Sequence, residues 1–374
     1  MTTTWRNNCL ASRHRALGSK LEDWNGMGIP WMYDTELYPQ DMYEQHKAVR
    51  TAAGLFDVSG LKKIHVVGPD AMDVLNHVCT RELSKVYPGK SAYACILNDD
   101  GLMTDDCIMF RMGPNSWMMV HGSGTGHEEL ARSAVYKNVS ILFDDDLHDI
   151  SLQGPKSVEF LAQHVPGIRD LRYFHHMQTT LFGRPVMISR TGYSGERGYE
   201  IFAKAADIGV IWDEIVARGA GQGIIPCCFT VLDMLRVESY LIFYPYDNSP
   251  EGDSLWELGL DFTVSKGKTA YRGAARHHAL KGKERIKIFG VLADTDGPLD
   301  AGDEIFADNR KVGVVTCGMY SKLTHKSMAL ARLEPSYARQ GAKLDVRGKN
   351  STCPAIAHAI PFDDPDKKKR SVVG

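Results

Sequence analysis

The sequence predicts an α+β fold in which two repeated lobes are followed by a small all-β domain. Both halves of the first 285 residues read strand, Gly-Pro, helix, strand, turn, strand, helix, and the Gly-Pro steps begin at Gly68 and Gly154, 86 residues apart. This order is typical of split βαβ, or ferredoxin-like, units. From Ile286 onward, short β-like runs alternate with turns, which predicts a separate β-barrel or sandwich.

The composition is that of a globular protein with no strong overall charge. The chain has 374 residues, 43% of them hydrophobic and 24% charged, which is enough for two or three domains with sizeable cores. The net charge of -2 indicates neither a nucleic-acid nor an anionic-membrane partner. No apolar run approaches the ~18 residues that a membrane-spanning helix needs. We therefore expect no nucleic-acid and no membrane partner.

The eight cysteines are scattered and form no CxxC pair, so their spacing predicts neither a disulfide framework nor a zinc site. This pattern fits a reducing compartment. The first 21 residues hold four basic and no acidic residues, yet they lack the amphipathic pattern of a transit peptide. We expect a cytoplasmic protein without a bound metal.

Residues 1–45 are polar with scattered aromatic side chains, and we expect them to wrap onto the core as an arm. A helix at Tyr43–Ala53, ending in a turn, leads into the first α+β lobe, residues 46–146. Its predicted strands are 63–67, 91–97, 104–111, 116–121 and 139–143, with helices after Gly68-Pro69 and over 126–137.

The second α+β lobe is predicted to span residues 147–285. Its strands are expected at 150–153 and 186–190 and from Ile201, with helices through Phe160, over 208–215 and over 232–240. The C-terminal β-barrel domain is predicted to span 286–363. Its strands are expected at 287–292, 304–307, 311–317, 327–333, 343–346 and 354–358. Residues 364–374 end the chain as a predicted disordered tail.

Two hairpins hold corresponding places in the two lobes, at Leu97–Asp106 and Arg190–Glu200. The second one carries Gly192, Gly195 and Gly198, each of which can take the positive φ that other residues resist. If the lobes pack about a pseudo-twofold axis, both hairpins face one central cleft, where ligand sites are common.

Asp106 is the candidate functional residue of the first hairpin. Strand alternation places it on the face of Ile108 and Phe110, whereas Asp105 shares a face with Cys107. Asp106 should therefore point toward apolar surroundings, where a carboxylate needs a partner. The alternative is an aspartate satisfied within the turn.

Several short motifs, in this order and spacing, give a resemblance to a known family. They are Phe56–Ser59, Gly89–Tyr93, Asn98–Gly101 with Asp105–Asp106, Leu152–Pro155, Arg190–Ile201, Asp233–Glu238, Leu258–Leu260 and Thr316–Gly318. Over about residues 40 to 335 the sequence resembles the glycine cleavage T-protein (aminomethyltransferase) family, which includes tetrahydrofolate-dependent demethylases. The resemblance implies a three-domain cloverleaf around a central folate channel, with tetrahydrofolate as cofactor.

Roles can be carried over where residues match. Asp106 matches the aspartate that contacts the pterin and supports catalysis. The positions that line the folate pocket are matched by Tyr93, Val120, Tyr193 and Glu200. Phe262 stands in place of a tryptophan beside the folate ring and can still stack. Leu232 replaces an arginine, and Gly60 replaces a histidine.

These roles imply a one-carbon transferase, or demethylase, that moves a methyl or methylene group from a small methylated donor to tetrahydrofolate. We expect aromatic side chains to close a donor pocket that attracts methylated cations. The residues expected around it are Trp31, Tyr33, Gly60, Tyr244 and Tyr246. One alternative is the T-protein itself, which takes an aminomethyl group from a lipoyl carrier protein. The other is a non-catalytic folate-binding protein, against which the presence of Asp106 argues.

Overall fold

Lobe one is built on a five-stranded antiparallel sheet with the strand order β5-β6-β7-β4-β8. A computed structural model describes residues 4–322, 324–349 and 352–372. Without the edge strand β5, the order is that of a ferredoxin-like unit, so the prediction for this lobe is confirmed. Its elements are β4 (Lys62–Val67), α3 (Ala71–Val78), η1 (Leu83–Lys85), β5 (Ser91–Leu97), β6 (Met103–Gly113), β7 (Ser116–His121), α4 (Gly126–Ser133) and β8 (Ser140–Phe143).

Lobe two repeats this plan in a six-stranded sheet with the order β10-β11-β12-β9-β3-β13. Its helices cover one face of the sheet and enclose a large apolar core around Ile150, Phe160 and Ile211. Its elements are β9 (Leu147–Gln153), α5 (Ser157–Ala162), η2 (Ile168–Asp170), β10 (His176–Leu181), β11 (Arg184–Ser189), β12 (Gly198–Lys204), α6 (Ala205–Gly219), η3 (Ala220–Gln222) and β13 (Ile224–Cys227).

One strand of lobe two comes from the part of the sequence assigned to lobe one. The predicted helix ends early, as α2 (Met42–Thr51), and β3 (Ala53–Asp57) follows it where a turn was expected. β3 runs between β9 and β13 with all five residues buried. Gly54 permits this insertion, because a Cβ there would lie 2.5 Å from Val49 and 2.6 Å from Cys227. The chain therefore passes from lobe two into lobe one near residue 58, whereas the predicted start of lobe one was residue 46.

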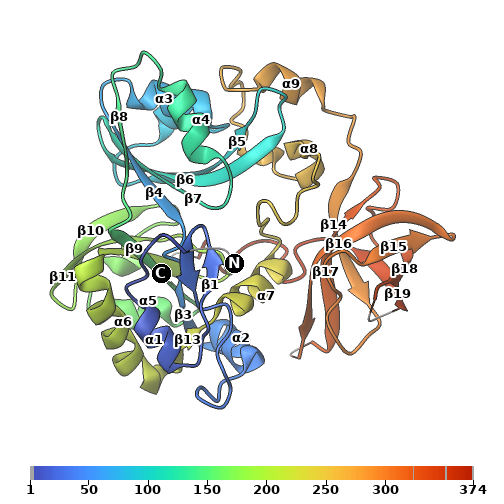
Figure 1. Ribbon diagram of the computed structural model, residues 1–374, viewed down its shortest axis with the longest axis horizontal. Coiled ribbons are helices and arrows are strands. Elements are labelled where there is room, and N and C mark those ends of the chain that lie inside the picture. The colour runs from blue at the N-terminus through green and yellow to red at the C-terminus, as the bar shows by residue number, and fades with distance from the viewer. Residues whose placement is uncertain (1–3, 323, 350–351, 373–374) are drawn as a thin grey trace.

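A second segment, which was predicted to belong to lobe two, packs on lobe one instead. After α7 (Phe229–Ser239), the chain runs through α8 (Leu255–Leu258), η4 (Asp261–Thr263) and α9 (Ala274–Ala279). These short helices and the loops between them pack on β5 and β6 of lobe one in a shared apolar cluster. Its members include Cys95, Leu97, Met103, Ile242, Leu255, Leu258 and Tyr271. Figure 1 shows α8 and α9 beside lobe one, between it and the barrel.

The C-terminal domain is a closed six-stranded barrel with the order β14-β17-β16-β15-β18-β19, as predicted. It lies apart from the two lobes in Figure 1, next to the C-terminal end of α7. Its strands are β14 (Lys287–Ala293), β15 (Glu304–Ala307), β16 (Arg310–Ser321), β17 (Lys326–Leu333), β18 (Lys343–Arg347) and β19 (Thr352–His358). Small and branched side chains such as Ala329, Ala331 and Val291 fill its interior.

The two terminal segments both lie against the lobes. The arm contains α1 (Ala11–Ala16), β1 (Glu22–Trp24) and β2 (Met27–Ile29), and the buried His14 joins it to Asp57 of β3 at 2.9 Å. Beyond the barrel the chain returns to lobe two, where Arg190 donates to the carbonyl oxygens of Arg370, at 3.3 Å, and Val372. Residues 364–372, predicted to be disordered, thus have defined contacts in the structure. The last two residues of the predicted tail lie outside the described ranges.

The sheets of the two lobes turn their helix-free faces toward each other. An apolar cluster joins Phe110, Met118 and Val120 of lobe one to Met187 and Phe202 of lobe two. The faces of β6 and β7 therefore meet the faces of β11 and β12, and the polar residues on these same faces are brought between the lobes. In the described ranges, no helix combines the length and the apolar character that crossing a membrane requires.

Candidate functional site

Asp106 lies on the inner face of the lobe-one sheet, as strand alternation predicts. Its Oδ2 accepts a 2.8 Å hydrogen bond from the Tyr93 hydroxyl. Burial, followed by the charge of Asp105, raises the pKa of Asp106 to about 7, and the bond from Tyr93 opposes this rise. An acid with such a pKa changes its charge close to neutral pH, which suits a group that meets a reacting nitrogen.

Asp105 points to the other side of the sheet and has a structural role. Its Oδ2 lies 2.7 Å from Nδ1 of His121 and accepts a 2.8 Å hydrogen bond from the backbone of Gly126, at the start of α4. Both the carboxylate and the imidazole are fully buried. Asp105 therefore ties β6 to β7 and α4, on the helix-covered side of the sheet.

Lobe two contributes a pair of buried acids. Glu200 on β12 lies opposite Ser151 of β9 and accepts a short hydrogen bond from the Thr191 hydroxyl. Asp149 lies two residues along β9 from Ser151, and neither of its oxygens has a partner among the described residues. Burial raises the pKa of Glu200, and burial together with the charge of Glu200 raises the pKa of Asp149 well above its usual range.

Lys63 is a buried cation on the same inner face of lobe one. It lies directly across from Val120 in the β4–β7 pair. Its Nζ donates to the carbonyl oxygens of Ser59 at 2.9 Å and Leu61 at 2.8 Å, and burial lowers its pKa to about 8. Sequence reasoning missed both Lys63 and Asp149. Lys63 follows another lysine in β4 and Asp149 follows a histidine in β9, so neither stands out in the sequence as a single charge within an apolar strand.

Tyr193 and Val120 complete the side chains expected around folate. Val120 is buried in the apolar layer between the lobes. The Tyr193 hydroxyl donates to the carbonyl oxygen of Ile242 at 2.6 Å, which fastens the glycine-rich hairpin to the segment after α7. Burial raises the pKa of both Tyr193 and Tyr93, and the charge of Asp106 adds to the rise in each, so the three groups share one electrostatic environment.

The three glycines of the hairpin differ in what they permit. Gly195 has a positive φ of 79°. Gly192 and Gly198 are instead places of close approach, because a Cβ on either would lie about 2 Å from the side-chain oxygen of Gln153, at 2.2 and 2.1 Å. The amide of Gln153 then donates to the Thr191 carbonyl at 3.2 Å, which fixes the loop beside Glu200.

Four of the five residues expected around an aromatic donor pocket lie in or beside one aromatic cluster, which is built around Trp24 and Phe229. Tyr33 is buried in the core, where its hydroxyl lies 3.1 Å from His14. Trp31 stacks on Phe229 with ring centroids 4.7 Å apart, and the backbone of Gly60 packs against Trp24. Tyr246 is exposed and packs on Phe243. The places of these four residues are set by how the arm and the loop after α7 pack on the lobes.

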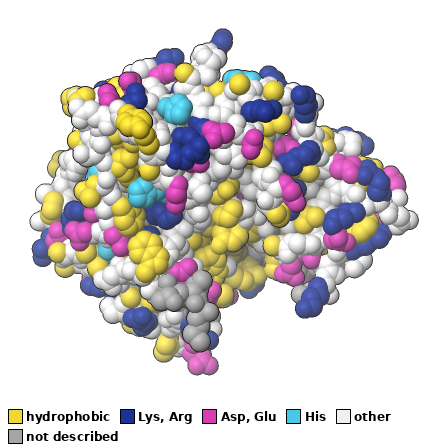
Figure 2. Space-filling model, turned by 45° about the horizontal axis from the view of Figure 1, so that its top comes forward, with side chains coloured by type: hydrophobic (Ala, Val, Ile, Leu, Met, Phe, Trp, Pro, Cys, Tyr) yellow, Lys and Arg dark blue, Asp and Glu magenta, His cyan; other side chains and the backbone are white. Residues whose placement is uncertain are grey.

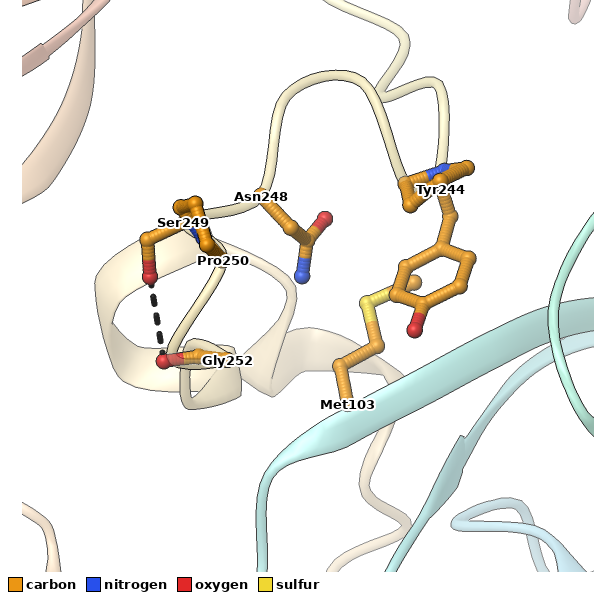
Figure 3. A pocket seen from close by; sticks show the side chains of 7 residues that line it. Met103, Tyr244, Asn248, Ser249, Pro250 and Gly252 are labelled. Atoms are coloured by element: carbon orange, nitrogen blue, oxygen red, sulfur yellow. Dashed lines mark hydrogen bonds between the residues drawn. The ribbon is translucent and has the colours of Figure 1, made fainter.

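Tyr244, the fifth of these residues, does line a cavity. The cavity has a volume of about 280 Å³ and is shown in Figure 3. Its walls are Met103, Tyr244, Pro245, Asn248, Ser249, Pro250 and Gly252. In Figure 3 the Asn248 amide points into the space beside Tyr244 and Met103.

Phe262 and Leu232 have different surroundings from each other. Phe262 is 57% exposed, and the Nζ of Lys367 lies 5.9 Å from the centre of its ring. Leu232 is buried in the cluster that joins the arm to α7, and an arginine head group there would have to displace apolar packing. No group of three or more His, Cys, Asp or Glu side chains in the described ranges is arranged to hold a metal ion.

Comparisons with known proteins agree with this architecture. The family model of the GCVT N-terminal domain matches residues 10–268, and that of the glycine cleavage T-protein C-terminal barrel domain matches residues 287–364. The crystal structure of glycine cleavage system aminomethyltransferase T from Bartonella henselae is similar, with a TM-score of 0.87 and 23% identity. The match covers 96% of this chain and 98% of that one, which shows a common fold.

Two relatives are similar to this chain over nearly their full lengths. The chain is 61% identical to the heme-dependent oxidative N-demethylase gamma subunit of Ectopseudomonas mendocina, with 100% of both chains covered. It is 30% identical to the aminomethyltransferase of Streptomyces coelicolor, over 96% of this chain and 98% of that protein.

Proposed function

The chain belongs to the glycine cleavage T-protein family, and on that premise we propose that it is a tetrahydrofolate-dependent one-carbon transferase. The observation that carries the proposal is the pair of acidic clusters on the facing inner sheets. Asp106, held by Tyr93, belongs to lobe one, and Glu200 with Asp149 belongs to lobe two.

The acids of lobe two fit the polar edge of a reduced pterin. That edge carries an amino group and a ring N–H, which are donors, and both oxygens of Asp149 are buried acceptors without a partner in the described ranges. Glu200 uses one oxygen to accept from Thr191 and keeps its other oxygen for a ligand. Donors on the pterin would favour the ionised form of both acids, which burial disfavours in the free protein, and hydrogen bonds to an ionised carboxylate are strong. Tyr93, Tyr193 and Val120 would cover the ring faces and exclude water.

Asp106 would act on the reacting nitrogens. Reduced folate, when bound, supplies the nitrogen nucleophiles that accept the carbon. A carboxylate fixed by Tyr93 can orient an N–H toward the donor carbon and stabilise positive charge as the bond forms. With a pKa of about 7, Asp106 can also take up the proton that the nitrogen loses.

We further propose that the carbon arrives at the oxidation level of formaldehyde. Removal of two electrons from an N-methyl group gives carbon at that level, and such an oxidation is named in the relative that is 61% identical. Condensation of one formaldehyde with two folate N–H groups releases one water and needs no further oxidant. The oxidative step would belong to a heme-bearing partner subunit, and this chain would perform the transfer.

The folate tail would be held by the C-terminal segment, since Leu232 offers no cation. Lys367 and Arg370 are close enough that the charge of Arg370 helps to lower the pKa of Lys367, after burial. No acid pairs with either side chain in the described part of the chain. Lys367 also lies over the ring of Phe262. Two adjacent cations beside a ring-stacking position suit the carboxylates of a glutamyl tail.

The test combines binding with turnover. Calorimetry should detect tetrahydrofolate binding, and formaldehyde with tetrahydrofolate should give methylenetetrahydrofolate faster than the spontaneous reaction, read by mass. The Asp106→Asn variant measures the background. Absence of binding at millimolar tetrahydrofolate would contradict the proposal. Turnover restricted to an aminomethylated lipoyl carrier protein, with ammonia release, would assign the aminomethyltransferase activity instead.

A further inference from the structure

Asn248 is a buried polar residue whose side chain has no partner. It is 9% exposed, and neither its amide nitrogen nor its amide oxygen makes a hydrogen bond to any described residue. An amide left in this way costs free energy unless a ligand or water satisfies it. Its side chain points into the cavity of about 280 Å³ described above (Figure 3).

The loop around Asn248 is held rigidly, so the unsatisfied amide is not a consequence of a loose segment. The preceding Asp247 accepts from Arg236 at 2.6 Å and from Thr316 at 2.6 Å. On the other side, Asp253 accepts from the Ser249 backbone and side chain, both at 2.6 Å. The Asp253 carbonyl also accepts from the Met103 backbone at 2.9 Å. The backbone that carries Asn248 is therefore held on both sides.

The cavity lies on the same face of the sheet as Asp106. A β-bulge between Ile96 and Leu97 shifts the register, so Cys95 pairs with Asp106 and Leu97 pairs with Met103. Cys95, Leu97 and Met103 accordingly belong to one apolar cluster. Without the bulge, Met103 would share the face of Asp105. The bulge thus places Met103, one wall of the cavity, on the face of β6 that carries Asp106, three residues away along the strand.

The chemistry of the walls selects for a neutral ligand. None of the seven lining residues has a charged side chain. A methylammonium ion there would find no counter-ion among the lining side chains. The Asn248 amide offers one acceptor and two donor hydrogens. Burial, and then the charge of Asp105, raises the pKa of Tyr244, so its hydroxyl remains a donor at neutral pH.

We propose that this cavity is the binding site for the one-carbon donor, and that the donor is a small neutral aldehyde-level compound, either formaldehyde as its hydrate or a carbinolamine. The hydrate carries two hydroxyl groups on one carbon, and each can donate and accept. The inference rests on the proposed function. It replaces the expected cation-binding aromatic pocket with an amide-lined one, and it assigns specificity to Asn248, which no sequence motif indicated.

The test uses Asn248→Leu, which keeps the volume and removes the amide, and Tyr244→Phe, which removes only the hydroxyl. Glu251→Gln is the matched control, because Glu251 is exposed in the same loop and is not among the lining residues. For Asn248→Leu the KM for formaldehyde should rise roughly tenfold, as expected for two lost hydrogen bonds. The KM for tetrahydrofolate should stay within about twofold. Glu251→Gln should leave both constants unchanged.

Binding without folate separates this inference from the proposed function. In the absence of folate, ¹³C-formaldehyde should show saturation transfer from the wild-type protein, and Asn248→Leu should weaken that signal. Because the amide has no protein partner, Asn248→Leu should not lower Tm. An unchanged KM for formaldehyde, or a rise confined to tetrahydrofolate, would overturn the inference. Absence of tetrahydrofolate binding to the wild-type protein would overturn the proposed function instead.

Discussion

Asp105 and Asp106 are consecutive residues whose carboxylates lie on opposite faces of one sheet. Asp105 is hydrogen-bonded to His121 and to the start of α4, and Asp106 is hydrogen-bonded to Tyr93 between the lobes. Alternation along β6 thus separates a structural acid from a proposed catalytic one by a single residue. The charge of the first still acts on the second, because it helps to raise the pKa of Asp106.

Asp106→Asn is expected to lower turnover by ~10²–10³, with a much smaller change in tetrahydrofolate affinity, because the amide keeps the shape and loses the charge. Single-turnover kinetics and calorimetry measure the two effects. Asp105→Asn serves as the neighbouring control and should reduce turnover far less. Equal losses at both positions would contradict the assignment of Asp106.

The pH dependence of kcat/KM should rise with pH through an apparent pKa of about 7, since the carboxylate form of Asp106 is the one proposed to act. Asp105→Asn removes the nearby negative charge and should move this inflection to lower pH. Asp106→Asn should abolish it. An inflection that persists in Asp106→Asn would have to come from another group.

Glu200→Ala removes an acceptor proposed to face the pterin. Loss of a charge-assisted hydrogen bond costs about 1.5–3 kcal/mol, so tetrahydrofolate affinity should fall at least tenfold. Calorimetry checks this, and near-ultraviolet circular dichroism reports whether lobe two remains folded. Affinity equal to that of the wild type would remove Glu200 from the site.

The double variant Lys367→Ser with Arg370→Ser should weaken binding of polyglutamylated tetrahydrofolate more than that of the monoglutamate. Lys368→Ser is the control within the same segment, because Lys368 is exposed and paired with Asp366 at 2.6 Å. The difference between the two folates should shrink as salt is added. If the double variant binds both folates more tightly, the segment obstructs the site rather than serving it.

Much of the fold could be predicted because local signals agreed with the final packing. The strands at 91–97, 116–121 and 304–307 appear with the predicted bounds. The β3 strand could not be predicted in its place, since its partners are β9 and β13, far along the chain. The contacts of residues 364–372 could not be predicted from the sequence either, because they involve Arg190, which is far away along the chain.

The site was predictable where a residue's neighbours on its own strand define its face, as for Asp106. The burial of Tyr33, by contrast, follows from its contact with His14, and the unpartnered state of Asp149 follows from what the two sheets leave between them. Both are properties of packing between distant segments. The sequence therefore predicted that aromatic side chains would surround the donor, but it did not show that Tyr244 is the one that lines the cavity.

The insertion of β3 between β9 and β13 has a consequence for how the chain folds during synthesis. Lobe one emerges from the ribosome while β3, already made, still lacks both neighbouring strands. Its five residues are buried in the finished protein, and until β9 and β13 appear they form an apolar strand with two open edges. A fragment that ends after lobe one should therefore aggregate unless it begins beyond residue 58, in which case the ferredoxin-like unit should stay dispersed.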